Sequence, residues 1–149
     1  MKAFIRRANL NDLDSIENCI NRAFKQYIPL LGKKPSSMNT DFNPIIQNGW
    51  VFVTEFESKI VALMVLRKEI DHIELRSVAV DPHFQNRGFG KQILDFVEKK
   101  TLDAGFSEIR LYTSARLPRL IEYWNNLGFE ETGRRTEGGY YRVFMSKML

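Results

Sequence analysis

The chain has 149 residues, of which 44% are hydrophobic and 12% aromatic, and its formal net charge is +4. This length fits one domain with one hydrophobic core, and the apolar content excludes a disordered linker or tail. The longest apolar run, residues 60–66, is far shorter than the ~20 residues of a membrane-spanning helix. Lys and Arg are dispersed along the chain, which argues against nucleic acid as a partner.

Cysteine usage and the amino-terminal residues bear on the cellular compartment. Cys19 is the only cysteine, so the chain can form neither an intrachain disulfide nor a cysteine-cluster metal site. Arg6 and Arg7 follow the first apolar residues before a signal-peptide core could form. We therefore expect a cytoplasmic protein that contacts no membrane and holds no metal.

In the first half of the chain, hydrophobic spacing predicts a strand, two helices and three further strands. Residues 3–7 form the first strand, and the apolar residues from Leu13 to Tyr27 then recur at helical spacing. Residues 28–38 are rich in turn formers, so we expect an exposed loop there, followed by a short helix that Gly49 ends. That short helix spans residues 41–47, and strands follow at residues 50–56, 60–67 and 72–80.

The second half alternates helices with strands. A helix runs from residue 89 to a stop at Gly105, and Lys100 interrupts its apolar face, with the ammonium group directed outward. A strand, a helix and a hairpin follow at residues 109–113, 117–127, 129–134 and 140–146. This order predicts an α+β sandwich on a mixed, mostly antiparallel central sheet of about seven strands, with helices on both faces. The strands at 72–80 and 109–113 are joined through a helix and must therefore be parallel.

One segment, from Val78 to Lys91, has the pattern of a ligand-binding loop. It reads as a strand, a tight turn and a loop with Gly88 and Gly90 that opens a helix. The first N–H groups of a helix have no partner within it, and together with the helix dipole they favour a bound phosphate. Arg87 and Lys91 add positive charge beside them, so a diphosphate is the expected class of ligand.

Two familiar phosphate loops do not fit this segment. Gln92 follows Lys91 where a P-loop requires serine or threonine, and the loop has only two of the three glycines of a dinucleotide fingerprint. A glycine-rich helix start without any ligand is the structural alternative to a phosphate site.

The segment resembles the acyl-coenzyme A loop of the GNAT superfamily of N-acetyltransferases. That family's signature is Gln or Arg, two residues of any kind, Gly, one residue of any kind, and Gly or Ala, and Gln85, Gly88 and Gly90 match it. A Val-Asp-Pro turn precedes the loop as in the family, and Leu127-Gly128-Phe129 is similar to its helix-to-strand step. The resemblance extends over most of the chain and implies the acyl-CoA N-acyltransferase fold.

In that family two neighbouring strands splay apart, and the coenzyme enters the gap between them. The resemblance implies that backbone groups of the strand ending at Val80 contact the pantetheine arm and the thioester, while the loop wraps the pyrophosphate. The implied acetyl-CoA site comprises Val78, Ala79, Val80, Gln85, Asn86, Arg87, Gly88, Phe89, Gly90, Lys91 and Ser114. Ser114 stands where many members have an asparagine, and capping of the next helix is its alternative role.

The resemblance also implies direct attack of an amine on the thioester, which needs a base or a water chain to take the amine's proton. Glu74 is the first candidate, because alternation along the strand places it on the face of Arg76, Val78 and Val80. An ordinary solvent-facing or ion-paired glutamate is the alternative. His72 could titrate near neutral pH, but it lies at the start of the strand, away from the expected thioester.

The departing thiolate in this family often receives a proton from a tyrosine four residues before the glycine of the Leu-Gly-Phe step. Trp124 occupies that position, and an indole cannot act as this acid. Either Tyr123 replaces the missing tyrosine, from a direction rotated by ~100° on the helix, or a thiolate of pKa ~8.5 leaves unassisted. Tyr112 and Tyr140 are further candidates.

We therefore expect an N-acetyltransferase that transfers an acetyl group from acetyl-CoA to a primary amine of a small molecule, a peptide or a protein. The acceptor is expected near residues 27–38 and the hairpin that contains Tyr140. A catalytically weak or inactive acyl-CoA-binding sensor or partner module of the same fold is the alternative, motivated by Trp124. The oligomeric state is open, with a homodimer as one option.

Overall fold

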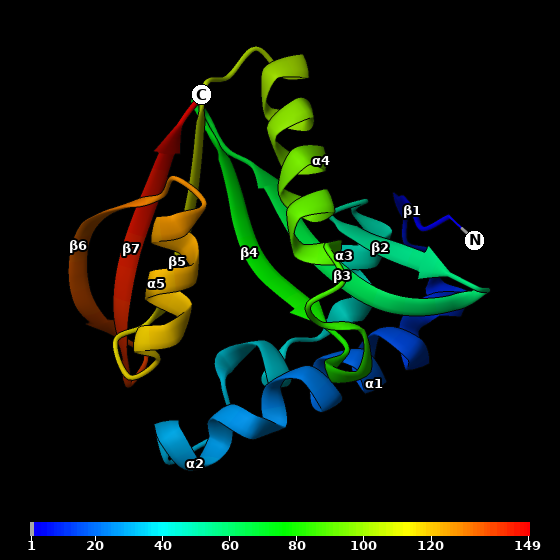
Figure 1. The fold of residues 1–149 in the computed structure, drawn as a ribbon, viewed down its shortest axis with the longest axis horizontal. Coiled ribbons are helices and arrows are strands. Elements are labelled where there is room, and N and C mark those ends of the chain that lie inside the picture. Colours follow the sequence, from blue (N-terminus) through cyan, green and yellow to red (C-terminus); the bar gives the residue numbers. More distant parts are fainter. Residues whose placement is uncertain (1) are drawn as a thin grey trace.

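A computed structural model describes residues 2–149 and contains a seven-stranded sheet (Figure 1). The strands lie in the order β1-β2-β3-β4-β5-β7-β6; β4 and β5 pair in parallel, and the other neighbours pair antiparallel. This arrangement confirms the α+β sandwich on a mixed sheet. The strands are β1 (Phe4–Arg7), β2 (Val51–Phe56), β3 (Lys59–Lys68), β4 (Ile73–Val80), β5 (Glu108–Ser114), β6 (Glu130–Glu137) and β7 (Tyr140–Met148).

The helices pack on both faces of this sheet. On one face, α1 and α3 cover β2, β3 and β4 through a core that includes Ile16 and Ile20. On the other face, α4 and α5 enclose a second core that includes Val97, Trp124 and Phe129. Among residues 2–149, no helix combines the length and the apolar character that a membrane crossing requires. The helices are α1 (Leu13–Phe24), α2 (Ile28–Leu31), α3 (Phe42–Gln47), α4 (Phe89–Asp103) and α5 (Pro118–Asn126).

The segment at residues 28–38, expected to be a loop, is more helical than predicted. A 3₁₀ turn continues α1 directly into α2, Gly32 ends α2 with a φ of +73°, and a second 3₁₀ turn begins after Pro35. Pro29 lies in the first turn of α2, where a missing N–H breaks no intrahelical hydrogen bond. The prolines therefore start short helices here instead of excluding them.

Strand β6 ends at Glu137, further along the chain than the expected end at residue 134. Seven of its eight residues are exposed, in agreement with its place at the edge of the sheet. Because neither face of β6 is buried, its sequence lacks the apolar alternation that marks the length of a half-buried strand. This end of the strand could not be read from hydrophobic spacing.

Strands β4 and β5 pair over a short stretch and then separate. Their parallel register joins Ile73 with Ile109 and Glu74 with Arg110, and beyond these pairs the two strands diverge (Figure 1). The connection between them runs through α4, which confirms the predicted parallel crossover. From Leu75 onward, β4 keeps its pairing with β3, but within the described part of the chain no strand pairs with its other edge. Backbone groups there are therefore available to a ligand.

A β-bulge interrupts β4 at Arg76. Leu75 pairs with Leu66 and Ser77 pairs with Val65, so Arg76 is an extra residue that has no counterpart on β3. Because side chains alternate between the two faces of a strand, one extra residue shifts every later side chain to the opposite face. The two halves of β4 therefore follow different alternations.

Candidate functional site

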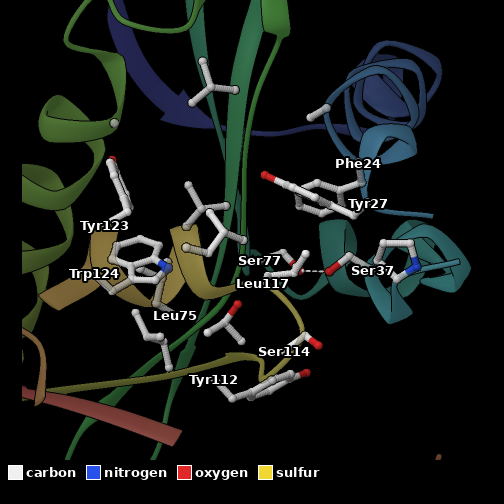
Figure 2. A pocket seen from close by; sticks show the side chains of 18 of the residues that line it. Phe24, Tyr27, Ser37, Leu75, Ser77, Tyr112, Ser114, Leu117, Tyr123 and Trp124 are labelled. Carbon is white, nitrogen blue, oxygen red and sulfur yellow. Dashed lines mark hydrogen bonds between the residues drawn. The ribbon is translucent and has the colours of Figure 1, made fainter. Parts of the chain in front are cut away.

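A cavity of about 360 Å³ lies where β4 and β5 diverge. Its walls come from both strands, the start of α4, α5, the end of α1 and the segment after α2. Figure 2 shows Tyr123 and Trp124 of α5 on one wall, Phe24 and Tyr27 on the opposite wall and Tyr112 of β5 below them. Apolar and aromatic walls with a few polar groups are typical of a small-molecule site.

The helix side of the cavity is the turn at residues 85–91, where α4 begins. Gly88 caps α4 with a φ of +86°, and Asn86 has a φ of +63°. Glycine and asparagine adopt this left-handed backbone at the lowest cost, which explains these residue types. No side chain of residues 2–149 caps the helix, so the first N–H groups of α4 remain free to bind an anion.

Hydrogen bonds fix this turn against the end of β4. Gln85 Nε2 donates to the carbonyl oxygen of Val80 at 3.1 Å, and Asp81 accepts from the His83 N–H at 3.0 Å and from Arg22 Nε at 2.7 Å. Burial alone would raise the pKa of Asp81, but these hydrogen bonds hold it below its usual value. Hydrogen bonds within the protein therefore hold the helix side in this conformation.

The two cations of the motif lie at the rim of the helix side. The Arg87 guanidinium lies 5.1 Å from the ring centroid of Phe84, whose ring in turn packs against Phe89. Lys91 Nζ pairs with Asp95 at 3.2 Å, and both side chains are largely exposed. An exposed pair of this kind is weak, so Lys91 can turn to an anion at the start of α4.

The residues of the expected coenzyme site fall into three groups. Arg87, Gly88 and Lys91 belong to the helix side but lie outside the cavity walls. Ala79 is buried beneath α1, so only its backbone can face a ligand on the open edge of β4. The residues that line the cavity are Val78, Val80, Gln85, Asn86, Phe89, Gly90 and Ser114.

Tyr123 and Trp124, the residue at the family's tyrosine position, both reach the cavity from α5 (Figure 2). The Trp124 ring packs against Phe129 with centroids 5.4 Å apart, so Trp124 is a core residue that also faces the cavity. The Tyr123 ring lies edge-on to Trp124 at 5.1 Å, and partial burial raises the pKa of its hydroxyl. Tyr123 is thus the phenol next to the position where the family has its tyrosine.

The Tyr123 hydroxyl lies against the backbone of Gly90 at the start of α4. A Cβ atom at Gly90 would collide with this hydroxyl oxygen, so the missing side chain is what permits the close approach. The second glycine of the motif therefore has a packing role toward α5 in addition to its predicted role toward a ligand. Motif spacing alone could not indicate the second role.

The structure does not bring Glu74 to the cavity. Because of the bulge at Arg76, Val78 and Val80 pack on the α4 face, and Glu74 is not among the described residues that line the cavity. Its carboxylate instead pairs with Arg76 Nε at 3.0 Å. The predicted shared face of Glu74 with Val78 and Val80 is wrong, and the ion-paired glutamate fits the geometry. His72 lies before β4 begins and also contributes nothing to the cavity walls.

Ser114 supports the turn that precedes α5. Its Oγ accepts a hydrogen bond from the Arg116 N–H at 3.1 Å, whereas α5 begins at Pro118 with Leu117 as its cap. The predicted helix-capping role is therefore corrected to a turn just before the helix. The residue also lines the cavity (Figure 2), so its side chain can still meet a ligand.

The hairpin side of the cavity is where residues 33–37 meet the β6-β7 hairpin. Lys33 Nζ donates to the carbonyl oxygen of Gly139 at 2.6 Å and lies 4.0 Å from the ring centroid of Tyr140. The Tyr140 hydroxyl donates to the carbonyl oxygen of Lys34 at 2.7 Å. These contacts hold the segment after α2 across the open end of the splayed strands.

Arg142 and a pair of serines complete the hairpin side. The Arg142 guanidinium carbon lies 4.2 Å from the ring centroid of Tyr112, and Arg142 Nη2 lies 3.5 Å from Ser36 Oγ. The Ser37 and Ser77 hydroxyls are 2.9 Å apart, drawn as a dashed line in Figure 2. No local sequence pattern marks Arg142 as a site residue, because it meets Ser36 across 106 residues of the chain.

Solved structures agree with this architecture. The PaiA N-acetyltransferase from Thermoplasma acidophilum in complex with coenzyme A is 18% identical over the whole of both chains, with a TM-score of 0.82. A GNAT-family acetyltransferase from Staphylococcus aureus is 18% identical over 99% of each chain, with a TM-score of 0.82. The ribosomal-protein-alanine N-acetyltransferase from Escherichia coli is 20% identical over 99% of this chain and 94% of its own, with a TM-score of 0.75.

A family model provides the assignment that these distant structures alone do not. The model of the acetyltransferase (GNAT) family matches residues 16–129. The matched region contains the splayed strands, the helix side of the cavity and all of α5, and it ends at the Leu-Gly-Phe step. The chain therefore belongs to the acetyltransferase (GNAT) family, as the resemblance of its loop implied.

Proposed function

We propose that the protein transfers the acetyl group of acetyl-CoA to the nitrogen of a primary amine. The observation that carries the proposal is one cavity that joins an uncapped helix N-terminus, an unpaired strand edge and a separate hairpin side. The helix side offers groups for the coenzyme, and the hairpin side leaves room for a second reactant. The Thermoplasma protein shares the fold and was solved in complex with coenzyme A, which supports a coenzyme site in this cavity.

The residues of the helix side fit the coenzyme. The free N–H groups of α4, with Arg87 and Lys91 beside them, would hold the pyrophosphate, and the open edge of Val78 and Val80 would hold the pantetheine arm. A Cβ at Gly88 would meet no atom within 4 Å, so a phosphate can approach the backbone there. The bound coenzyme supplies an activated acetyl thioester.

The proposed transfer forms one bond and breaks another. The neutral amine nitrogen attacks the thioester carbonyl carbon, a C–N bond replaces the C–S bond, and the nitrogen loses a proton. A backbone N–H on the open edge of β4 near Val78 would stabilise the negative charge that develops on the carbonyl oxygen, which is worth about 3 kcal/mol in comparable sites. Tyr123 would give the coenzyme sulfur its proton, and its raised pKa keeps its hydroxyl protonated at neutral pH.

The surroundings of the amine ease the loss of its proton without a carboxylate. Among the described residues that line the cavity, the charged ones are Arg76 and Arg142, and the glutamates that pair with them, Glu74 and Glu137, do not line it. Nearby positive charge disfavours an ammonium ion and lowers its pKa, so more of the acceptor is the neutral nucleophile. We therefore propose that water takes the proton and that Glu74 is not the base.

A panel of primary amines, from small molecules to peptides, tests the proposal. With acetyl-CoA and a suitable acceptor, the protein should release coenzyme thiol, which a thiol-reactive dye detects. Calorimetry measures acetyl-CoA binding separately. Binding without thiol release on any amine would contradict the enzyme and indicate the acyl-CoA sensor that Trp124 favours. Absence of binding would contradict the coenzyme site itself.

A further inference from the structure

The hairpin side carries more positive than negative charge. Glu137 is shared by two guanidinium groups, at 3.0 Å from Arg135 Nε and 3.0 Å from Arg142 Nη1. Lys33 Nζ lies beside them on a carbonyl oxygen and an aromatic ring, and no carboxylate of residues 2–149 lies within 4.0 Å of it. Two guanidinium groups thus share one carboxylate, and Lys33 adds a third positive charge on the same hairpin side.

Arg142 is held in place with part of its binding capacity unused. Its guanidinium lies 4.2 Å from the ring centroid of Tyr112 and 5.7 Å from that of Tyr140. Nη1 donates to Glu137, and Nη2 reaches Ser36 only at 3.5 Å, although a guanidinium has five N–H donors. The side chain is 17% exposed and lines the cavity. A partly desolvated, stacked guanidinium with free donors is well suited to bind a carboxylate.

The cavity offers no matching site for a second cation. Among the described lining residues, Arg76 and Arg142 are charged, and none is Asp or Glu. A diamine would place an ammonium ion near these guanidinium groups, whose carboxylate partners, Glu74 and Glu137, do not line the cavity. An acceptor with a carboxylate at the same place gains an attraction instead.

We propose that the acceptor is an amine that also carries a carboxylate, which Arg142 binds while the amine points toward β4 at Ser77. This inference rests on the proposed function and names the substrate class for it. The same chemistry occurs in amino-acid-like small molecules and in peptides with an acidic residue next to the amino terminus. Diamines and basic peptides are disfavoured acceptors.

Three acceptors of similar length share a primary amine and differ in the charge at the other end: γ-aminobutyrate is negative there, its amide is neutral and putrescine is positive. Thiol release gives kcat/KM for each, and we expect γ-aminobutyrate to exceed putrescine by at least about tenfold, with the amide between them. The C-terminally amidated peptides Ala-Glu-Ala, Ala-Gln-Ala and Ala-Lys-Ala, which differ in whether they carry a carboxylate, form a second arm. Higher kcat/KM values for the small molecules indicate a small-molecule acceptor, and higher values for the peptides indicate a peptide acceptor.

Charge reversal at Arg142 sharpens the test. Arg142→Glu should invert the order, so that putrescine becomes the better acceptor, and a gain of this kind cannot result from misfolding. Arg142→Lys keeps the charge and should keep the order, with a higher KM for γ-aminobutyrate. Arg134→Gln, an exposed arginine on β6 that pairs with Glu131, is the matched control and should leave the order and the rates unchanged.

Binding is measured apart from turnover. In the coenzyme A-loaded protein, the NMR signal of the Arg142 side-chain Nε–H should shift on addition of γ-aminobutyrate and not of putrescine. Equal kcat/KM for the three acceptors, or a wild-type preference for putrescine, would overturn the inference and leave acetyl transfer intact. If no amine releases thiol, the proposed function fails, and the presence or absence of the NMR shift decides the inference by itself.

Discussion

The two sides of the cavity are built from different parts of the chain. The helix side consists largely of backbone: the left-handed residues Asn86 and Gly88, the uncapped N–H groups of α4 and the open edge of β4. The hairpin side consists of side chains such as Lys33 and Tyr140, whose contacts join segments 106 residues apart.

This difference suits the two proposed ligands. Backbone groups bind a constant ligand such as the coenzyme, because their positions depend on the fold and not on which side chains are present. Side chains on the hairpin side can be exchanged without altering the sheet, so they are suited to choosing among acceptors. We therefore expect changes on the helix side to affect coenzyme binding and changes on the hairpin side to affect acceptor choice.

Gly88→Glu should have the largest effect. A negatively charged side chain at the uncapped end of α4 excludes a phosphate, so the affinity for acetyl-CoA should fall at least about a hundredfold. Gly105→Glu is the matched control, because Gly105 follows the other end of α4 with an equally open surrounding and a φ of +83°. Calorimetry should find near-normal affinity in the control. An equal loss in both variants would mean that backbone strain, and not the phosphate site, causes the effect.

Tyr123→Phe should lower kcat about tenfold and leave acetyl-CoA affinity nearly unchanged, because a thiolate leaves readily but gains from a proton donor. Gly90→Ala should act on the same group by displacing the Tyr123 hydroxyl. The double variant should then be no slower than the slower single variant. Tyr141→Phe, at an exposed tyrosine outside the cavity, is the control. An unchanged kcat in Tyr123→Phe would dismiss this acid.

Asp81→Asn should weaken the support of the helix side. Asp81 is 5% exposed and accepts hydrogen bonds from Arg22 and His83, so its loss should lower the free energy of unfolding by roughly 1–2 kcal/mol. Because folding lowers the pKa of Asp81, its stabilisation is present above its unfolded pKa and is lost as the pH falls through the folded value. Thermal melts of wild type and variant should therefore converge below about pH 4. Asp95→Asn, at an exposed ion pair, should change little at any pH.

Glu74→Gln should have the smallest effect. Its carboxylate pairs with Arg76 outside the cavity, so kcat and its pH profile should stay within about twofold of the wild type. Steady-state rates across a range of pH check this. A fall of kcat beyond about tenfold, with a shifted acidic limb of the pH profile, would restore Glu74 as the base and contradict the proposed proton route.

The helix side could be predicted from the sequence because its determinants are local. Gln85, Gly88 and Gly90 lie within one short segment, and the glycines and the helix start that follows them all depend on neighbouring residues. The parallel pairing of β4 with β5 was equally predictable, since two parallel strands of one sheet are usually joined by a crossover helix.

The features that escaped prediction depend on register or on distant contacts. The bulge at Arg76 arises in the pairing of β4 with β3 and reversed the expected face of Glu74. Its trace in the sequence is two consecutive polar residues, Arg76 and Ser77, which interrupt the apolar alternation. The hairpin side forms only when Lys33 meets Gly139 and Arg142 meets Ser36 across the folded chain. In the sequence, each of the two cations is indistinguishable from an ordinary surface cation. The approach of Tyr123 to Gly90 likewise depends on how α5 packs beside α4.

The central claim is acetyl transfer from coenzyme to amine, and one product analysis tests it most directly. The protein is mixed with acetyl-CoA and γ-aminobutyrate, and free coenzyme thiol and acetylated product are quantified together, the product by mass spectrometry. We expect one N-acetylated molecule for every thiol released, and none of either with Gly88→Glu. Thiol release without an N-acetyl product, or acetylation that persists unchanged in Gly88→Glu, would contradict the account.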